Sequence, residues 1–222
     1  MMRKAIKYFA EVTYKPLLVK YLSRERNYSY NGIKLLISPE VFHPAFFFST
    51  KILLKYINRF NLKQKTFLEL GAGSGLISIS AAKKGAIVTA TDINPIAVGY
   101  LKQNSKANNV CLNIIQSDLF ENISRSPFDF IAINPPYYKK QPNSYKDYAW
   151  YCGENGEYFY DLFGSLANYM NEKSVALMIL SDACDFEMIN RIASQNRFKL
   201  NCVYTKQNWL EKNFIYAIER MK

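Results

Sequence analysis

The sequence of 222 residues predicts a doubly wound α/β fold, in which a mostly parallel sheet of seven strands is covered by helices on both faces. Two observations predict this class. From residue 66 onward, short apolar runs alternate with amphipathic stretches of helical length, which is the pattern of consecutive strand–helix–strand units. The last two apolar runs, 198–205 and 213–219, are joined by a short link, so we expect a C-terminal hairpin that adds one antiparallel strand.

The elements of the sheet follow in chain order. The residues expected to form strands are 66–70, 86–91, 110–115, 128–133, 174–181, 198–205 and 213–219. The residues expected to form helices between them are 76–84, 95–108, 156–171 and 185–195. No apolar run reaches the length of about 20 residues that crosses a bilayer, so we predict no membrane partner.

The first 60 residues are expected to form an appendage on the substrate side of a main domain that spans residues 61–222. Within the appendage, residues 27–37 indicate a hairpin, because Asn31-Gly32 is the preferred two-residue hairpin turn. Residues 45–60 have the apolar periodicity of a helix.

The net charge of +11 favours negatively charged partners, such as nucleic acid, a ribosome or an acidic protein face. The same charge is also typical of a surface that only needs to be soluble. Residues 1–26 hold seven of the 29 basic residues and two acids, with apolar residues at helical spacing. This basic helix either touches the substrate or packs its apolar face on the main domain, and a helix at a membrane surface is a less favoured third alternative.

The cysteines are far apart in the sequence and form no C-x-x-C pair: Cys111, Cys152, Cys184 and Cys202. Free, buried thiols in a reducing compartment are therefore expected, rather than disulfides or a metal site. The only histidine, His43, stands beside a proline in a loop and is expected to be structural. We predict a cytoplasmic protein, most simply a monomer, that holds no metal ion.

A glycine-rich turn follows the first strand of the main domain. Gly71, Gly73 and Gly75 occupy alternate positions. Ala72 stands between the first two glycines, and Glu69 lies within the strand. Such a turn lets a ligand lie against the backbone, and the helix after it presents unpaired N–H groups to an anionic group. The spacing is neither the dinucleotide fingerprint nor, without a lysine, a phosphate loop. A cofactor loop is favoured over glycines that merely end a strand.

Acidic residues follow the next two strands, and ligands of doubly wound sheets bind at the carboxyl ends of the strands. Asp92, followed by Ile93, comes about twenty residues after the first glycine, where an acid accepts hydrogen bonds from both ribose hydroxyls. Asp92 or Asn94 could also cap the helix that begins at Pro95, and capping and ribose binding are compatible roles. Ser117 and Asp118 follow the third strand, where the carboxylate either accepts from the exocyclic amine of adenine or is one more loop acid.

The fourth strand ends in Asn134-Pro135-Pro136-Tyr137. The prolines hold the backbone extended and remove two N–H donors, which leaves carbonyl groups to face a ligand. The Asn134 side-chain oxygen and the Pro135 carbonyl make two acceptors, suited to the two hydrogens of an –NH₂ group. Tyr137 can stack on the flat group that bears this amine. In this sheet position, a site for a planar amine or amide nitrogen is favoured over a rigid turn.

The motifs ELGAGSG, DINPIAV, SDLF and NPPY, in this order, resemble those of the class I S-adenosylmethionine (SAM) dependent methyltransferases of the amino type, which have a Rossmann-like fold. Residues 153–160, GENGEYFY, are similar to a stretch of the HemK-like protein-glutamine methyltransferases. Residues 33–54, in which Ser49-Thr50 opens a helix, are similar to that family's hairpin and following segment. The resemblance covers roughly residues 30–219.

The resemblance implies SAM as the cofactor. For cofactor binding it implies Thr50, Glu69, Gly71, Ala72, Gly73, Gly75, Asp92, Ile93, Ser117, Asp118 and Asn134. For methyl transfer it implies Asn134, Pro135, Pro136 and Tyr137.

The acceptor implied by the resemblance is glutamine in a translation factor or ribosomal protein. The chain departs from bacterial HemK proteins in its short basic segment before residue 30 and in His43-Pro44, which replaces a proline-arginine-proline loop. The alternative acceptor is therefore the exocyclic amino group of adenine or guanine in RNA or DNA. An inactive binding module would not need the glycine loop and the NPPY motif, and an NAD-dependent oxidoreductase would need a different loop spacing.

Overall fold

The computed structural model describes residues 22–44, 48–208 and 211–221. Most of the basic helix predicted for residues 1–26, and the first residues of the helix predicted for 45–60, lie outside the described residues. Within the described residues, no helix is long and apolar enough to span a bilayer.

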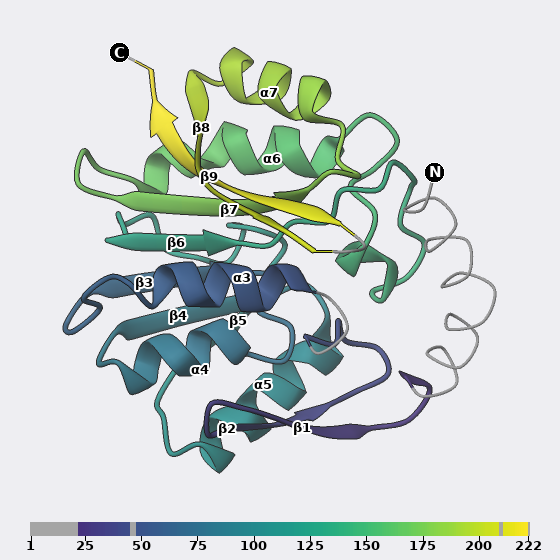
Figure 1. Cartoon of the computed structure of the whole chain (residues 1–222), viewed down its shortest axis with the longest axis vertical. Helices are drawn as coiled ribbons and strands as arrows, with labels where there is room; N and C mark the ends of the chain where they lie inside the picture. Colours follow the sequence, from purple (N-terminus) through teal and green to yellow (C-terminus); the bar gives the residue numbers. More distant parts are fainter. Residues whose placement is uncertain (1–21, 45–47, 209–210, 222) are drawn as a thin grey trace.

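A sheet of seven strands forms the centre of the molecule, in the order β5-β4-β3-β6-β7-β9-β8 (Figure 1). Its strands are β3 (Thr66–Leu70), β4 (Ile87–Asp92), β5 (Asn113–Gln116), β6 (Phe130–Ile133), β7 (Val175–Ser181), β8 (Phe198–Gln207) and β9 (Lys212–Arg220). The strands from β5 to β7 pair in parallel, whereas β9 is antiparallel to both β7 and β8. The prediction of a doubly wound, mostly parallel sheet with one antiparallel strand is confirmed.

Helices cover both faces of the sheet (Figure 1). One face carries α3 (Phe48–Ile57), α4 (Leu76–Lys83) and α5 (Pro95–Ala107), and the other carries α6 (Glu157–Leu166) and α7 (Phe186–Gln195). Each face of the sheet packs on its helices in a hydrophobic core. Successive residues of one strand contribute to the two cores in turn, because strand side chains alternate between faces. In β3, Phe67 packs with the first group of helices and Leu68 with the second.

Several predicted boundaries are wrong by a few residues. β5 begins at Asn113 rather than at residue 110, because the Val110 N–H donates to Ser105 at the end of α5 and so is not free for the sheet. β6 begins at Phe130, since the Phe128 N–H donates to the carbonyl of Tyr169. The helix predicted for 156–171 is shorter, because a 3₁₀ turn at Ala167–Tyr169 replaces its last turns. The cysteine prediction also needs correction, because Cys111 and Cys202 are exposed while Cys152 and Cys184 are buried.

A two-stranded sheet of β1 (Arg26–Tyr30) and β2 (Ile33–Ile37) packs beside α5, as predicted for a hairpin. Asn31 and Gly32 both have positive φ, 49° and 77°, which is the type I′ turn that matches strand twist. The side chain of Asn104 in α5 accepts from the Leu36 N–H at 2.8 Å and donates to the Leu36 carbonyl at 2.9 Å. A helix side chain thus takes the place of a third strand at this edge of β2.

Gly75 ends the glycine-rich turn and caps α4 with a φ of 88°. A Cβ atom at this position would overlap Leu101 Cδ1 of α5, a side chain that is fully buried. Gly75 therefore lets α4 and α5 pack closely, and it also provides a left-handed backbone that other residues adopt at a cost.

We expect Gly75→Ala to lower the free energy of unfolding by about 2 to 4 kcal/mol, because overpacking and left-handed strain add. Urea unfolding at pH 7 measures the change. The matched control is Gly99→Ala in α5, where an added Cβ meets nothing within 4 Å. This control should raise stability by up to about 1 kcal/mol, since alanine is the better helix former. An equal response of both variants would contradict the packing role of Gly75.

Candidate active site

The loops after β3, β4, β5 and β6 meet at one pocket, at the carboxyl ends of the strands. The strand order changes direction between β3 and β6, which is the switch point where doubly wound sheets bind ligands. The pocket is lined by nearly all of the residues that the sequence predicted, namely Thr50, Glu69, Gly71, Ala72, Gly73, Asp92, Ile93, Ser117, Asp118, Asn134, Pro135, Pro136 and Tyr137. Gly75 alone of the predicted residues does not line it, and it packs against Leu101 instead.

The glycine loop forms one wall of the pocket. A Cβ added at Gly71 would meet no atom within 4 Å, so the backbone here faces open space. The Gly73 N–H donates to Asp92 Oδ2 at 2.8 Å, which ties the loop after β3 to the end of β4. A ligand can therefore lie directly against the backbone at Gly71 while the loop keeps its shape.

Asp92 is fixed by two backbone groups. Its Oδ2 accepts from Gly73, and its Oδ1 accepts from the Asn94 N–H at 2.9 Å. The cap of α5 is Asn94, whose side chain accepts from the Ile96 N–H at 2.9 Å, so Asp92 is not the cap. Burial raises the pKa of Asp92, against the opposing effect of these N–H groups. The carboxylate keeps further lone pairs, which are able to accept from hydroxyl groups of a ligand.

Glu69 lies beneath the glycine loop, in β3. Its Oε2 accepts from the Ser78 N–H at 2.8 Å and from the Ser78 hydroxyl. Burial raises the pKa of Glu69 to about 8, with a further contribution from the charge of Asp92, although the bonds from Ser78 oppose the shift. At neutral pH this side chain is mainly a neutral acid, and a nearby cationic group would favour its ionised form.

This raised pKa predicts that stability falls as pH rises. Between pH 4.5 and about 8 the native state holds a proton on Glu69 that the unfolded chain has lost, so the free energy of unfolding decreases by up to about 1.4 kcal/mol per pH unit. Glu69→Gln removes the titration, and its stability relative to the parent chain should rise between pH 5.5 and 7.5. Urea unfolding at several pH values measures this difference. Exposed Glu172 provides the control variant, Glu172→Gln, and a pH-independent difference for Glu69→Gln would contradict the assignment.

The loop after β5 brings Ser117 and Asp118 to the pocket, and the two side chains differ in burial. Ser117 is buried, and its hydroxyl accepts from the Asn122 N–H at 3.0 Å, so it shapes the loop. Asp118 is exposed at the pocket wall. Its pKa is raised by partial burial and by the negative charges of Glu121 and Asp161. Of the two, the Asp118 carboxylate is the group available to a ligand.

The NPPY segment lies at the far end of the pocket from Asp92. Asn134 Nδ2 donates to Thr50 Oγ1 at 3.2 Å, and none of the described residues donates to Asn134 Oδ1. Pro135 and Pro136 are buried. Tyr137 makes a hydrogen bond with Ser181, and burial raises the pKa of its phenol. The arrangement leaves one amide oxygen at the pocket as an acceptor.

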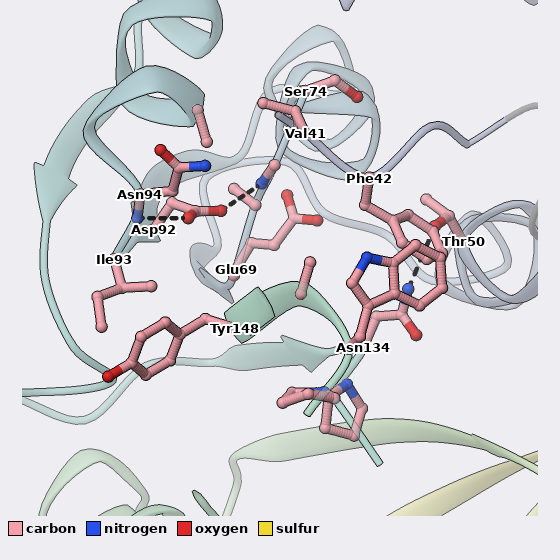
Figure 2. Close-up of a pocket in the computed structure, with 18 of the residues that line it drawn as sticks. Val41, Phe42, Thr50, Glu69, Ser74, Asp92, Ile93, Asn94, Asn134 and Tyr148 are labelled. Atoms are coloured by element: carbon pink, nitrogen blue, oxygen red, sulfur yellow. Dashed lines mark hydrogen bonds between the residues drawn. The ribbon is translucent and has the colours of Figure 1, made fainter. Parts of the chain in front are cut away.

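Figure 2 shows how these side chains divide the pocket. Asp92 and Ile93 lie at one end, Thr50 and Asn134 lie at the other, and Glu69 lies between them. A ligand that reached from Asp92 to Asn134 would pass over the glycine loop.

Sequence reasoning missed the aromatic rim of the pocket. Phe42 and Trp150 pack together with ring centroids 5.2 Å apart, and both line the pocket. Tyr148 also lines the pocket (Figure 2). The signal in the sequence was the density of aromatic residues between 137 and 151, but nothing in that segment showed which rings face the pocket.

The residues present fit SAM. Open space at Gly71, a fixed carboxylate at Asp92 and a largely buried acid at Glu69 offer contacts for its ribose and its cationic end. The pocket joins these contacts to Asn134 without a break.

Comparisons with known proteins show the family to which the chain belongs. Residues 32–201 match the model of the methyltransferase small domain family. A protein of Methanocaldococcus jannaschii, provisionally named protein N5-glutamine methyltransferase, is 41% identical over 168 residues, which cover 72% of this chain and 83% of the relative. The matches therefore extend over most of both proteins.

Solved structures give the same fold. Mtq2 of E. cuniculi, solved in the complex responsible for methylation of the termination factor eRF1, has a TM-score of 0.63 and 18% identity, covering 82% of this chain and 99% of that one. The T. thermophilus 16S rRNA N2 methyltransferase, solved with AdoMet and guanosine, has a TM-score of 0.63 and 16% identity, covering 90% of this chain and 50% of that one. The solved structures show the fold, and the family match and the M. jannaschii relative lead to one conclusion: the chain belongs to the methyltransferase small domain family and is a SAM-dependent N-methyltransferase.

Proposed function

We propose that the chain methylates the side-chain amide nitrogen of a glutamine in a protein, such as a translation factor or a ribosomal protein. The observation that carries the proposal is the acceptor oxygen of Asn134, held at the pocket by the bond from Nδ2 to Thr50. The provisional name of the M. jannaschii relative supports a protein amide over other nitrogen acceptors.

In the proposed reaction, bound SAM supplies an activated methyl group on a positively charged sulfur. Asn134 Oδ1 and the Pro135 carbonyl accept the two hydrogens of the acceptor nitrogen and so raise the electron density on it. The pocket also places this nitrogen in line with the methyl group, which is mainly a proximity effect. The N–C bond forms as the C–S bond of the sulfonium breaks, and the neutral thioether leaves without help from an acid. The proton lost from the methylated nitrogen passes to solvent water, so no histidine is required.

The remaining site residues have proposed roles in holding the cofactor. Asp92 accepts from the ribose hydroxyls, Ile93 and Asp118 contact the adenine, and the backbone from Gly71 to Gly73 lies along the middle of the molecule. The division of the pocket in Figure 2, with Asp92 and Asn134 at opposite ends, supports this order.

We also propose that residues 1–60 serve the acceptor side of the pocket. Support comes from Phe42 and Thr50, which line the pocket from this segment. A cytoplasmic location and a monomeric state stay predictions.

A second candidate is the exocyclic amino group of adenine or guanine in RNA or DNA. The observation that favours it is the rim of exposed tyrosines that line the pocket, where Tyr138, Tyr145 and Tyr148 are 43%, 51% and 37% exposed. Lysines 139, 140 and 146 lie in the same segment. Aromatic rings interleaved with basic residues stack on unpaired bases and contact phosphates.

One labelling experiment separates the two candidates. The purified protein is incubated with methyl-labelled SAM and extract of the source cells from which its gene has been deleted, so that the natural acceptor is unmethylated. The product is divided and treated with protease or with nuclease. A second portion is hydrolysed in strong acid, which breaks an amide C–N bond and releases methylamine but leaves a methylated purine intact. The Asn134→Ala protein provides the background.

We expect label that is lost to protease, kept through nuclease and released as volatile methylamine. Label lost to nuclease and retained on a purine would overturn the glutamine proposal and establish the second candidate.

A further inference from the structure

Thr50 contacts the side chain that the proposed function places at the reacting nitrogen. Its Oγ1 accepts from Asn134 Nδ2 at 3.2 Å, although the two residues are 84 positions apart in the sequence (Figure 2). The family resemblance implied a role for Thr50 in cofactor binding, and that role stays a prediction. In the structure the Thr50 side chain bonds to Asn134 of the NPPY segment.

The position of Thr50 is set by the core. Thr50 lies in the first turn of α3, and Leu53, Leu54 and Ile57 follow it at intervals of three, four and seven residues. These three side chains are at most 2% exposed and belong to the core under α4 and the sheet. Residues at this spacing share one helix face, so the Thr50 hydroxyl is held on the inner side of α3.

An asparagine amide is planar, so fixing one of its ends fixes the other. While Nδ2 donates to Thr50, Oδ1 must point away from Thr50, and within the described chain no other donor occupies it. Rotation of the amide by half a turn would present Nδ2 to the acceptor nitrogen, where two donors would face each other. The bond to Thr50 therefore restrains the position and plane of the Asn134 amide at the pocket, and in the orientation of the structure Oδ1 is left for an –NH₂ acceptor.

We infer that Thr50 is a positioning residue, which acts on methyl transfer by holding the Asn134 amide with Oδ1 toward the acceptor nitrogen. This inference rests on the proposed role of Asn134 as the acceptor of substrate hydrogens. It predicts that loss of the hydroxyl lowers the rate of transfer and leaves SAM binding nearly unchanged.

The test compares Thr50→Val, which keeps the shape and removes the hydroxyl, with Thr50→Ser, which keeps the hydroxyl. We expect kcat to fall about 10- to 50-fold in Thr50→Val, corresponding to the loss of one aligned hydrogen bond. Thr50→Ser should stay within about threefold of the parent. The Kd for SAM, measured by calorimetry, should change by less than about twofold in both variants, and thermal unfolding checks that each is folded.

A double-mutant cycle gives the decisive readout. If Thr50 acts through Asn134, then Thr50→Val should cause no further loss of kcat in a chain that already carries Asn134→Ala. Independent losses that multiply would overturn the inference, and so would a fall in SAM affinity as large as the fall in kcat.

The same cycle tests the role of Thr50 separately from the proposed role of Asn134. An Asn134→Ala chain with undiminished kcat would overturn the role of Asn134 itself. A large loss in Asn134→Ala with none in Thr50→Val would overturn only the role of Thr50.

Discussion

Asn134→Ala is expected to reduce kcat by about 100- to 1,000-fold, because removal of one preorganised polar group from a catalytic site has effects of this size. The reason is specific to this pocket. The Oδ1 atom of Asn134 has no donor among the described residues, so its bond with the substrate nitrogen is the one that transfer depends on. At saturating SAM, transfer of labelled methyl groups measures kcat, and calorimetry measures the Kd for SAM, which should change by less than about threefold.

The control for this experiment is Asn113→Ala. Asn113 is exposed at the start of β5 and does not line the pocket, so kcat should stay at the level of the parent chain. A loss of SAM affinity in Asn134→Ala that matched the loss of kcat would contradict the role in transfer and would make Asn134 a cofactor ligand.

Asp92→Ala is expected to weaken SAM binding and to leave kcat nearly unchanged, the reverse of the result expected for Asn134→Ala. The Kd for SAM should rise about 30- to 100-fold, because hydrogen bonds to a charged acceptor contribute about 1.5 to 3 kcal/mol each. Part of the loss would come from the protein itself, since the Gly73 and Asn94 N–H groups would lose their common acceptor. At saturating SAM, kcat should stay within about threefold of the parent.

Asp92→Asn provides the graded control for this position. It keeps one oxygen and replaces the other with an amide donor, which cannot accept from both backbone groups, so an intermediate Kd is expected. Calorimetry at a single pH compares the SAM affinities of the three proteins. Unchanged affinity in Asp92→Ala would remove the ribose contact from the proposed function.

The sequence predicted those parts of the site that are short motifs placed directly after a strand. The glycine loop, Asp92 and NPPY each follow an apolar strand, and the rule that ligands bind at carboxyl ends of strands brings them together without any knowledge of distances. The rule holds here because β3, β4 and β6 are neighbours and parallel.

The parts that could not be predicted depend on contacts between distant residues. The bond between Thr50 and Asn134, the packing of Gly75 on Leu101 and the pairing of Phe42 with Trp150 each join segments that are far apart in the chain. The glycine spacing predicted a ligand at Gly75, and the structure adds a close approach to α5 that also requires glycine there. Asn104 is a further example. Its burial, which only the structure shows, means that its polar side chain needs hydrogen-bond partners, and these lie outside α5.

The partners of Asn104 have a consequence for the order in which the molecule assembles. Besides its two bonds to Leu36 in β2, its Nδ2 atom donates to the Ser74 carbonyl of the glycine loop at 3.0 Å. During synthesis β2 leaves the ribosome first, yet its bonds to Asn104 cannot form until that residue, 68 positions later, has emerged. The hairpin and the glycine loop should therefore acquire their final form together, in a step that α5 completes before the second half of the sheet is made.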